Sequence, residues 1–109
     1  MKFSFDEPAI IDVDDIVDYY SIIRRRLAVR FIEELYGRIR LVCENPRMGL
    51  SMDDRFRQVL LNDFPYAVVY EIDQATNTVH VTAVRHQQRS PGYWRDRVQE
   101  EPAIYQLAA

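Results

Sequence analysis

The sequence predicts one small α+β domain in which two helices are followed by three antiparallel strands. Three observations support this class. Apolar residues recur at helical spacing between positions 13 and 42, alternating runs follow between positions 55 and 84, and the joins between these runs are short and turn-like. We therefore expect residues 1–109 to form a single domain, since this length suits one compact core.

The first elements are a short strand and a helix. The alternating segment KFSF predicts the strand, and the turn residues DEP end it. Pro8 suits the first turn of the helix, with Asp6 as its N-cap and acidic residues favoured at that positive end. One face of the predicted helix carries Val13, Ile16, Val17, Tyr20 and Ile23.

A second apolar stripe comprises Ala28, Phe31, Ile32, Leu35, Ile39 and Val42. The two stripes run nearly in phase across RRRL, so the pattern alone does not distinguish one long helix from a helical hairpin. A single helix from Pro8 to Glu44 would be long for this domain, which favours a break within residues 21–27. Pro46 ends the helical region because proline disfavours a helical conformation at Asn45.

Three strand-like runs follow: RFRQVLL, YAVVYEI and TVHVTAV. The third places Val79, Val81 and Ala83 on one predicted face, by simple alternation. The joins NDFP and DQATN are short, so the three strands should form an antiparallel meander. The complete order is β-α-α-β-β-β, with the helices packed on one face of the sheet.

Composition excludes several classes. The formal net charge is only −3, which does not indicate a nucleic-acid binder. No stretch approaches the roughly 20 apolar residues of a membrane span, and the N-terminus lacks the apolar core of a signal peptide. Cys43 is the single cysteine, so no internal disulfide forms, which fits the cytoplasm. Two histidines and one cysteine without metal-ligand spacing predict no metal site.

The segment RHQQRSPGYWRDR, after the third strand, is the strongest candidate for binding. The planar guanidinium groups of its arginines are suited to bind phosphates or the carboxylates of an acidic partner. A solvated tail that pairs with the acidic first helix is an equally good interpretation. Adjacent aromatic residues favour a tail anchored to the domain through Trp94. The candidates for binding a target or partner are Arg85, Arg89, Tyr93, Trp94, Arg95 and Arg97.

From FSFDEPAIIDVDDIVDYY through RFIEELYGRI and NPRMG to LLNDFPYAVVYEI and AVRHQQRSPGYWRDR, the chain resembles the RelE/ParE superfamily of toxins. These proteins belong to type II toxin–antitoxin systems and are also called plasmid stabilisation proteins. The resemblance implies that the first strand joins the meander in one sheet, against which a helical hairpin packs. It also implies a cognate antitoxin as partner, and it implies no cofactor.

The two branches of the superfamily differ in chemistry. Members similar to ParE poison DNA gyrase by binding, whereas members similar to RelE cut mRNA on the ribosome. A nuclease here would draw on Arg57, Arg85, His86 and Tyr93, with Glu71 as a further carboxylate. The lysines of the RelE pattern are missing, because Lys2 is the only lysine. We therefore favour the ParE-like reading, without catalysis, over the RelE-like endonuclease.

Structural alternatives apply to each candidate. His86 more readily caps the strand end or stacks on Trp94 than acts as a base, and His80 is more readily a residue of the sheet surface than a ligand. Arg57 could instead form a cross-strand pair with Glu71 or another acid. A third reading is a binding module that keeps the toxin fold but not its toxicity. The sequence leaves the oligomeric state open.

Overall fold

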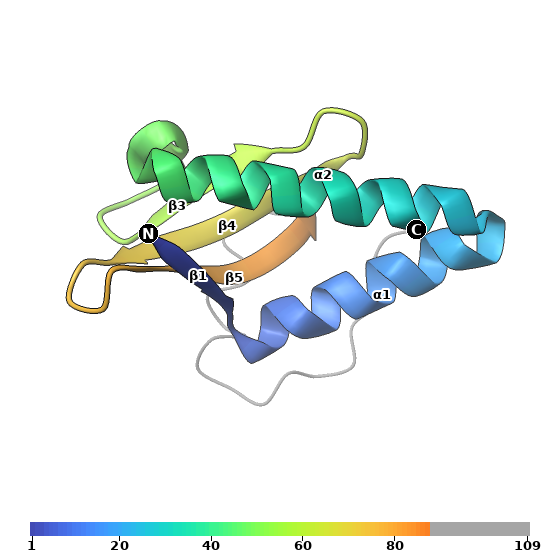
Figure 1. Ribbon diagram of the computed structural model, residues 1–109, viewed down its shortest axis with the longest axis horizontal. Helices are drawn as coiled ribbons and strands as arrows, with labels where there is room; N and C mark the ends of the chain where they lie inside the picture. Colours follow the sequence, from blue (N-terminus) through green and yellow to red (C-terminus); the bar gives the residue numbers. More distant parts are fainter. Residues whose placement is uncertain (88–109) are drawn as a thin grey trace.

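The computed structural model describes residues 1–87 and confirms the α+β class (Figure 1). The elements follow in the order β1 (Lys2–Phe5), α1 (Glu7–Ile23), α2 (Arg25–Glu44), the 3₁₀ turn η1 (Pro46–Met48), β2 (Leu50–Ser51), β3 (Phe56–Leu60), β4 (Tyr66–Asp73) and β5 (Thr78–His86). The sequence predicted all of these except η1 and β2, which are too short to show a period.

The five strands form one sheet in the order β1-β5-β4-β3-β2. β2 to β5 make an antiparallel meander, and β1 pairs in parallel with the first half of β5, from Thr78 to Val81. The helical hairpin of α1 and α2 packs on one side of this sheet (Figure 1). We call this side the helix side and the other the opposite side.

The two helices meet at Arg24, inside the predicted interval. This residue is extended, with φ −168° and ψ 126°, and is the C-cap of α1 and the N-cap of α2. Its N–H donates to Tyr20 O at 2.8 Å, and its carbonyl accepts from the N–H of Leu27 at 3.0 Å. A single residue therefore reverses the chain without the glycine or proline that usually marks such a break.

A β-bulge in β5 corrects one prediction about its faces. Tyr70 pairs with Val81 and Val69 pairs with Ala83, so Thr82 is the extra residue. Val79 and Val81 belong to the core on the helix side, whereas Ala83 packs with Phe56 and Val69 on the opposite side. Simple alternation wrongly placed Ala83 on the same face as Val79 and Val81, because the bulge shifts the period by one residue.

The main core lies between the helical hairpin and the sheet. Phe31 is fully buried at its centre, and its ring lies 5.6 Å from that of Phe64 and 5.7 Å from that of Tyr66, both in edge-to-face geometry. Tyr20 of α1 contacts the same three rings. These aromatic contacts join both helices to β4 and to the loop before it.

Asp12 of α1 is a buried polar residue that links the hairpin to β5. β1 pairs with β5 only as far as Val81. On that edge of the sheet, the part of β5 after Val81 therefore has no strand partner within residues 1–87. The Val84 N–H on this edge donates to Asp12 Oδ2 at 3.0 Å. The carboxylate thus takes the place of a neighbouring strand, and the buried N–H is satisfied.

Candidate functional site

The first two nuclease candidates lie on opposite sides of the sheet. Arg57 is two residues before Val59, which belongs to the main core, so it is on the helix side. Arg85 is two residues after Ala83, on the opposite side. The structure therefore does not bring these two guanidinium groups to a common anion position.

Arg57 holds a turn. Its Nη1 donates to Gly49 O at 2.8 Å and to Arg47 O at 3.3 Å. The same turn is clamped by Tyr70, whose hydroxyl donates to Pro46 O at 2.7 Å and accepts from the Gly49 N–H at 3.0 Å. Arg57 thus contacts main-chain carbonyls and does not pair with Glu71.

Glu71 instead pairs with Arg55. The two guanidinium nitrogens Nε and Nη2 of Arg55 donate to its carboxylate at 2.8 and 3.2 Å. The pair raises the pKa of Arg55, mainly through this hydrogen bond. Arg55 also lies over the ring of Phe56, 4.8 Å from the centroid. The cross-strand pairing of Phe56 with Glu71 brings the two charged groups together, so this carboxylate is already occupied.

Arg85 and His86 occupy the end of β5. The Arg85 side chain is almost fully buried, and its Nη2 donates to Gln58 Oε1 at 2.8 Å on the opposite side. The ring of His86 packs edge-to-face on that of Tyr66, with 5.4 Å between centroids, on the helix side. Burial raises the pKa of the Tyr66 hydroxyl, which is uncharged at neutral pH. His86 thus makes an aromatic contact with Tyr66, whereas the predicted partner Trp94 lies outside the described residues, so stacking on Trp94 stays a prediction.

The other predicted binding residues, Arg89, Tyr93, Trp94, Arg95 and Arg97, lie outside the described residues. The anchoring of the tail through Trp94 stays a prediction for the same reason.

His80 is part of a hydrogen-bonded chain on the opposite side. Its Nδ1 lies 2.8 Å from Ser4 Oγ on β1, and its Nε2 lies 3.3 Å from Asp73 Oδ2. Hydrogen bonds to Thr76, followed by the one to His80, lower the pKa of Asp73. Asp6 lies nearby, where burial raises its pKa, and its Oδ2 accepts from Thr82 Oγ1 at 3.4 Å. This arrangement matches a residue of the sheet surface.

The sequence reasoning missed a hollow at the end of the sheet, where β3 begins and β4 ends. Its volume is about 340 Å³, and it lies around the turn that Arg57 holds. The lining residues are Arg47, Ser51, Asp53, Asp54, Arg55, Arg57, Ile72 and Gln74. The segment NPRMG marks the end of the helical region and contributes to the family resemblance, but neither pattern predicts a role for Gly49.

Gly49 lies at a point where another part of the chain closely approaches the backbone. A Cβ atom at Gly49 would lie 2.4 Å from Tyr70 Oη and 2.9 Å from Gln58 O, which is closer than such atoms pack. Glycine is therefore required here because the tyrosine hydroxyl reaches the backbone, and not because of an unusual φ, which is −72°.

Within residues 1–87, no group of three or more metal-ligating side chains is gathered in one place, and neither helix combines the length and apolar character needed to cross a bilayer.

The comparisons with known proteins agree with this fold. The model of a family described as the ParE toxin of the type II toxin–antitoxin system, parDE, matches residues 3–91. None of the curated protein sequences gives a significant match.

Three solved structures are similar. A chain of the chromosomal ParDE system from P. aeruginosa has a TM-score of 0.67 and 14% identity, covering 79% of this chain and 95% of that one. The isolated E. coli RelE toxin has a TM-score of 0.60 and 23% identity, covering 90% and 96%. A chain of the intact E. coli RelBE toxin–antitoxin complex has a TM-score of 0.60 and 23% identity, and the match covers 81% of this chain and 98% of that one. At these identities the similarity shows the fold.

Proposed function

This chain belongs to the family of ParE toxins of type II toxin–antitoxin systems, and we propose that it stops bacterial growth by binding a target such as DNA gyrase. It acts in the cytoplasm, without a cofactor and without cutting a substrate. A cognate antitoxin binds the toxin and keeps it inactive, so that the pair stabilises the plasmid or other replicon that encodes it.

One observation carries the choice of binding over RNA cleavage. Arg57 and Arg85 lie on opposite sides of the sheet, and both donate to groups of the protein itself. Cleavage of RNA without a metal needs a base, an acid and a cation around one phosphate. Arg57 and Arg85 do not meet this requirement together, and this supports the ParE-like reading.

The antitoxin is proposed from the family and from the type of complex in which the neighbours were solved, ParDE and RelBE. Side-chain chemistry indicates which groups the antitoxin would present to this chain. Arginine-rich surfaces favour a partner that presents carboxylates, and exposed apolar residues such as Leu50 and Leu60 favour one that also presents apolar anchors.

The test is to express the full chain alone and together with the antitoxin encoded next to it. We expect growth arrest only without the antitoxin, and inhibition of DNA supercoiling by purified gyrase when the toxin is added. Total messenger RNA should stay intact during the first minutes of induction.

Two outcomes would contradict the proposal. Prompt cutting of messages, with supercoiling activity unchanged, would indicate the RelE-like endonuclease. Normal growth with confirmed folded toxin in the cell would indicate a binding module without toxicity.

A further inference from the structure

The hollow at the end of the sheet adjoins a second one. The second hollow has a volume of about 480 Å³ and is lined by Met1, Asn45, Pro46, Arg47, Ile72, Gln74 and Asn77. Three of its residues, Arg47, Ile72 and Gln74, also line the first hollow. The two hollows therefore form one continuous depression, which we call the sheet-end groove. One half is rich in arginine, and the other half is more apolar.

Arg57 brings a fixed positive charge to this groove. Its Nη1 is held by two carbonyl oxygens, of Arg47 and Gly49, which carry no formal charge. Within residues 1–87, Arg57 is in no ion pair, unlike Arg55 with Glu71 and Arg30 with Asp63. A guanidinium that is oriented but not neutralised is suited to bind an anion.

Arg47 adds a second charge. It lines both hollows, and its side chain is exposed and in no ion pair among the described residues. Arg57 binds the carbonyl of Arg47 itself, so the backbone that carries the two cations is held in place. We call these two arginines the cationic pair: Arg47 lines both halves of the groove, and Arg57 lines the arginine-rich half.

The surrounding charges select the kind of anion. Asp53 and Asp54 line the arginine-rich half, and a neighbouring hollow is lined by Asp6, Glu71 and Asp73. A nucleic acid, which carries regularly spaced phosphates, would meet these acids after the first contact. A single carboxylate on a protein segment needs only one position, which Arg47 and Arg57 offer in the half that Asp53 and Asp54 also line, and an adjacent apolar side chain could pack on Ile72 and Pro46.

We propose that the sheet-end groove binds an extended segment of the antitoxin, with a carboxylate on Arg47 and Arg57 and an apolar side chain in the other half. The inference rests on the proposed function, because it names the place where the partner is held. It predicts that the segment carries an acidic residue next to an apolar one.

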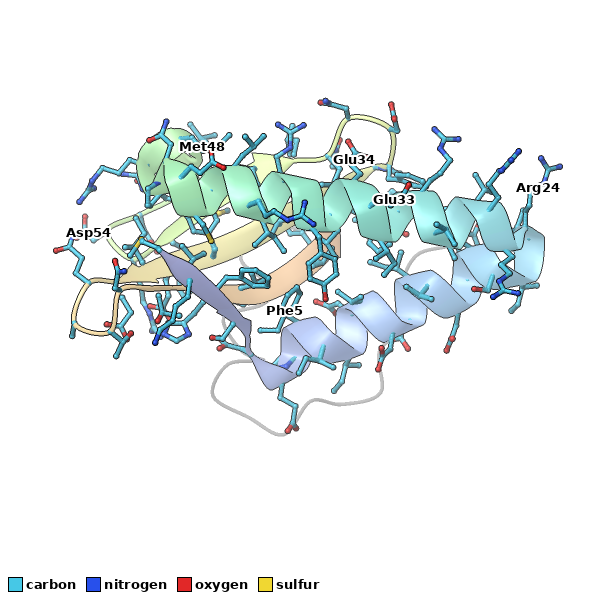
Figure 2. The ribbon with its side chains drawn as sticks, viewed as in Figure 1. Phe5, Arg24, Glu33, Glu34, Met48 and Asp54 are labelled. Atoms are coloured by element: carbon cyan, nitrogen blue, oxygen red, sulfur yellow. The ribbon has the colours of Figure 1, made fainter. Side chains whose placement is uncertain are left out.

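The experiment measures the affinity of the full toxin chain for the fluorescently labelled antitoxin encoded beside it. Arg47→Glu reverses an exposed charge in the groove, and Gln74→Glu adds one at a residue that lines both halves. Arg24→Glu is the matched control, since Arg24 is exposed and lies at the end of the molecule opposite Asp54 (Figure 2). The three melting temperatures verify that each variant is folded.

We expect both groove variants to raise the dissociation constant about tenfold or more, and the control to change it less than about twofold. Added salt should weaken binding of the wild-type chain more than that of Arg47→Glu, because the cationic pair is partly exposed. A photoactivatable cross-linker at position 74 should capture an acidic peptide of the antitoxin.

Other results overturn the inference. If both groove variants bind the antitoxin like the wild type, the groove is not the binding site, although the proposed function stands. If Arg47→Glu weakens binding of a short single-stranded RNA or duplex DNA and leaves antitoxin binding unchanged, the anion is a phosphate. If the wild-type chain does not bind the antitoxin, the inference and the proposed function both fail.

Discussion

On the helix side of the sheet, large aromatic and aliphatic side chains pack against both helices, whereas the opposite side has only a small apolar cluster around Phe56, among polar and charged residues. The strands β4 and β5 supply side chains to both sides. In β4, Val68 and Tyr70 point to the helices, while Val69 and Glu71 point away. The contrast therefore arises from alternation along each strand.

The two sides of the sheet contribute differently to the stability of the molecule. The helix side buries a large contiguous apolar core, and burial of such side chains is the main favourable term in folding. The opposite side has a small cluster around Phe56, with charged pairs at its margin. We therefore expect core substitutions on the helix side to lower stability more than those on the opposite side, and substitutions of exposed residues in the sheet-end groove to alter binding first.

The largest effect should come from Phe31→Ala. Its ring is fully buried against Phe64 and Tyr66, so its loss removes apolar contacts and leaves a cavity. We expect about 4–5 kcal/mol lower stability, and about 3 kcal/mol for Phe56→Ala on the opposite side, where fewer core residues surround the ring. Urea denaturation of both variants measures the difference. Equal losses would show that the two faces are equally packed.

Asp12→Ala tests the link between the hairpin and β5. The substitution leaves the buried Val84 N–H without its carboxylate acceptor, which should lower stability by about 2–3 kcal/mol. Asp12→Asn keeps an acceptor oxygen and should lower it by less than half as much. Hydrogen exchange at the Val84 amide reports the bond directly. Slow exchange in the alanine variant would mean that another group satisfies this amide.

The order of elements could be predicted because each rests on local signals. The apolar stripes, Pro8 and Pro46 defined the helices, and alternation defined three strands. The hairpin break at Arg24 was predicted only as an interval, because no local signal marks it. The bulge at Thr82 was missed for a different reason. It depends on the partner strand, since Val69 and Tyr70 face Ala83 and Val81 across the ladder.

The site was harder to predict than the fold. Residue type made Glu71 a reasonable partner for Arg57, but the register opposes Glu71 to Phe56, and Arg55 reaches it. Arg57 instead contacts carbonyls of a turn that is distant from Glu71 in sequence. Which group each arginine contacts depends on how the strands and the turn pack together, and this cannot be predicted from the spacing of residues in the sequence. The close approach of Tyr70 to Gly49 is of the same kind.

Gly49→Ala should have a smaller effect than the core substitutions. The new methyl group would press on Tyr70 Oη and Gln58 O, so the turn must shift, with a loss of about 1–2 kcal/mol. Because this turn supports Arg47 and Arg57, the affinity for the antitoxin should fall as well. Adding Tyr70→Phe removes the hydroxyl and should recover part of the stability. No loss at all would mean that the turn adapts freely.

The smallest effects concern two aspartates near His80 on the opposite side, whose pKa values shift in opposite directions. Burial raises the pKa of Asp6 above its ordinary value of 3.8, so its contribution to stability is present below that value and lost as the pH rises through the folded pKa. Hydrogen bonds to Thr76 lower the pKa of Asp73, so its contribution is present above 3.8 and lost as the pH falls through the folded pKa.

Asp6→Asn and Asp73→Asn should therefore change stability in opposite senses. At pH 7 the asparagine at position 6 removes a carboxylate that burial disfavours, and stability should rise slightly, whereas at position 73 it removes a favoured carboxylate, and stability should fall slightly. The difference at position 6 should shrink as the pH falls through the raised folded pKa toward 3.8, whereas the difference at position 73 should shrink only as the pH falls below 3.8 toward the lowered folded pKa. Urea denaturation between pH 3 and pH 7 checks both trends. Changes of the same sign at pH 7 would mean that hydrogen bonding at Asp6 outweighs its burial, and the charged margin of the opposite side would then stabilise the fold at both aspartates.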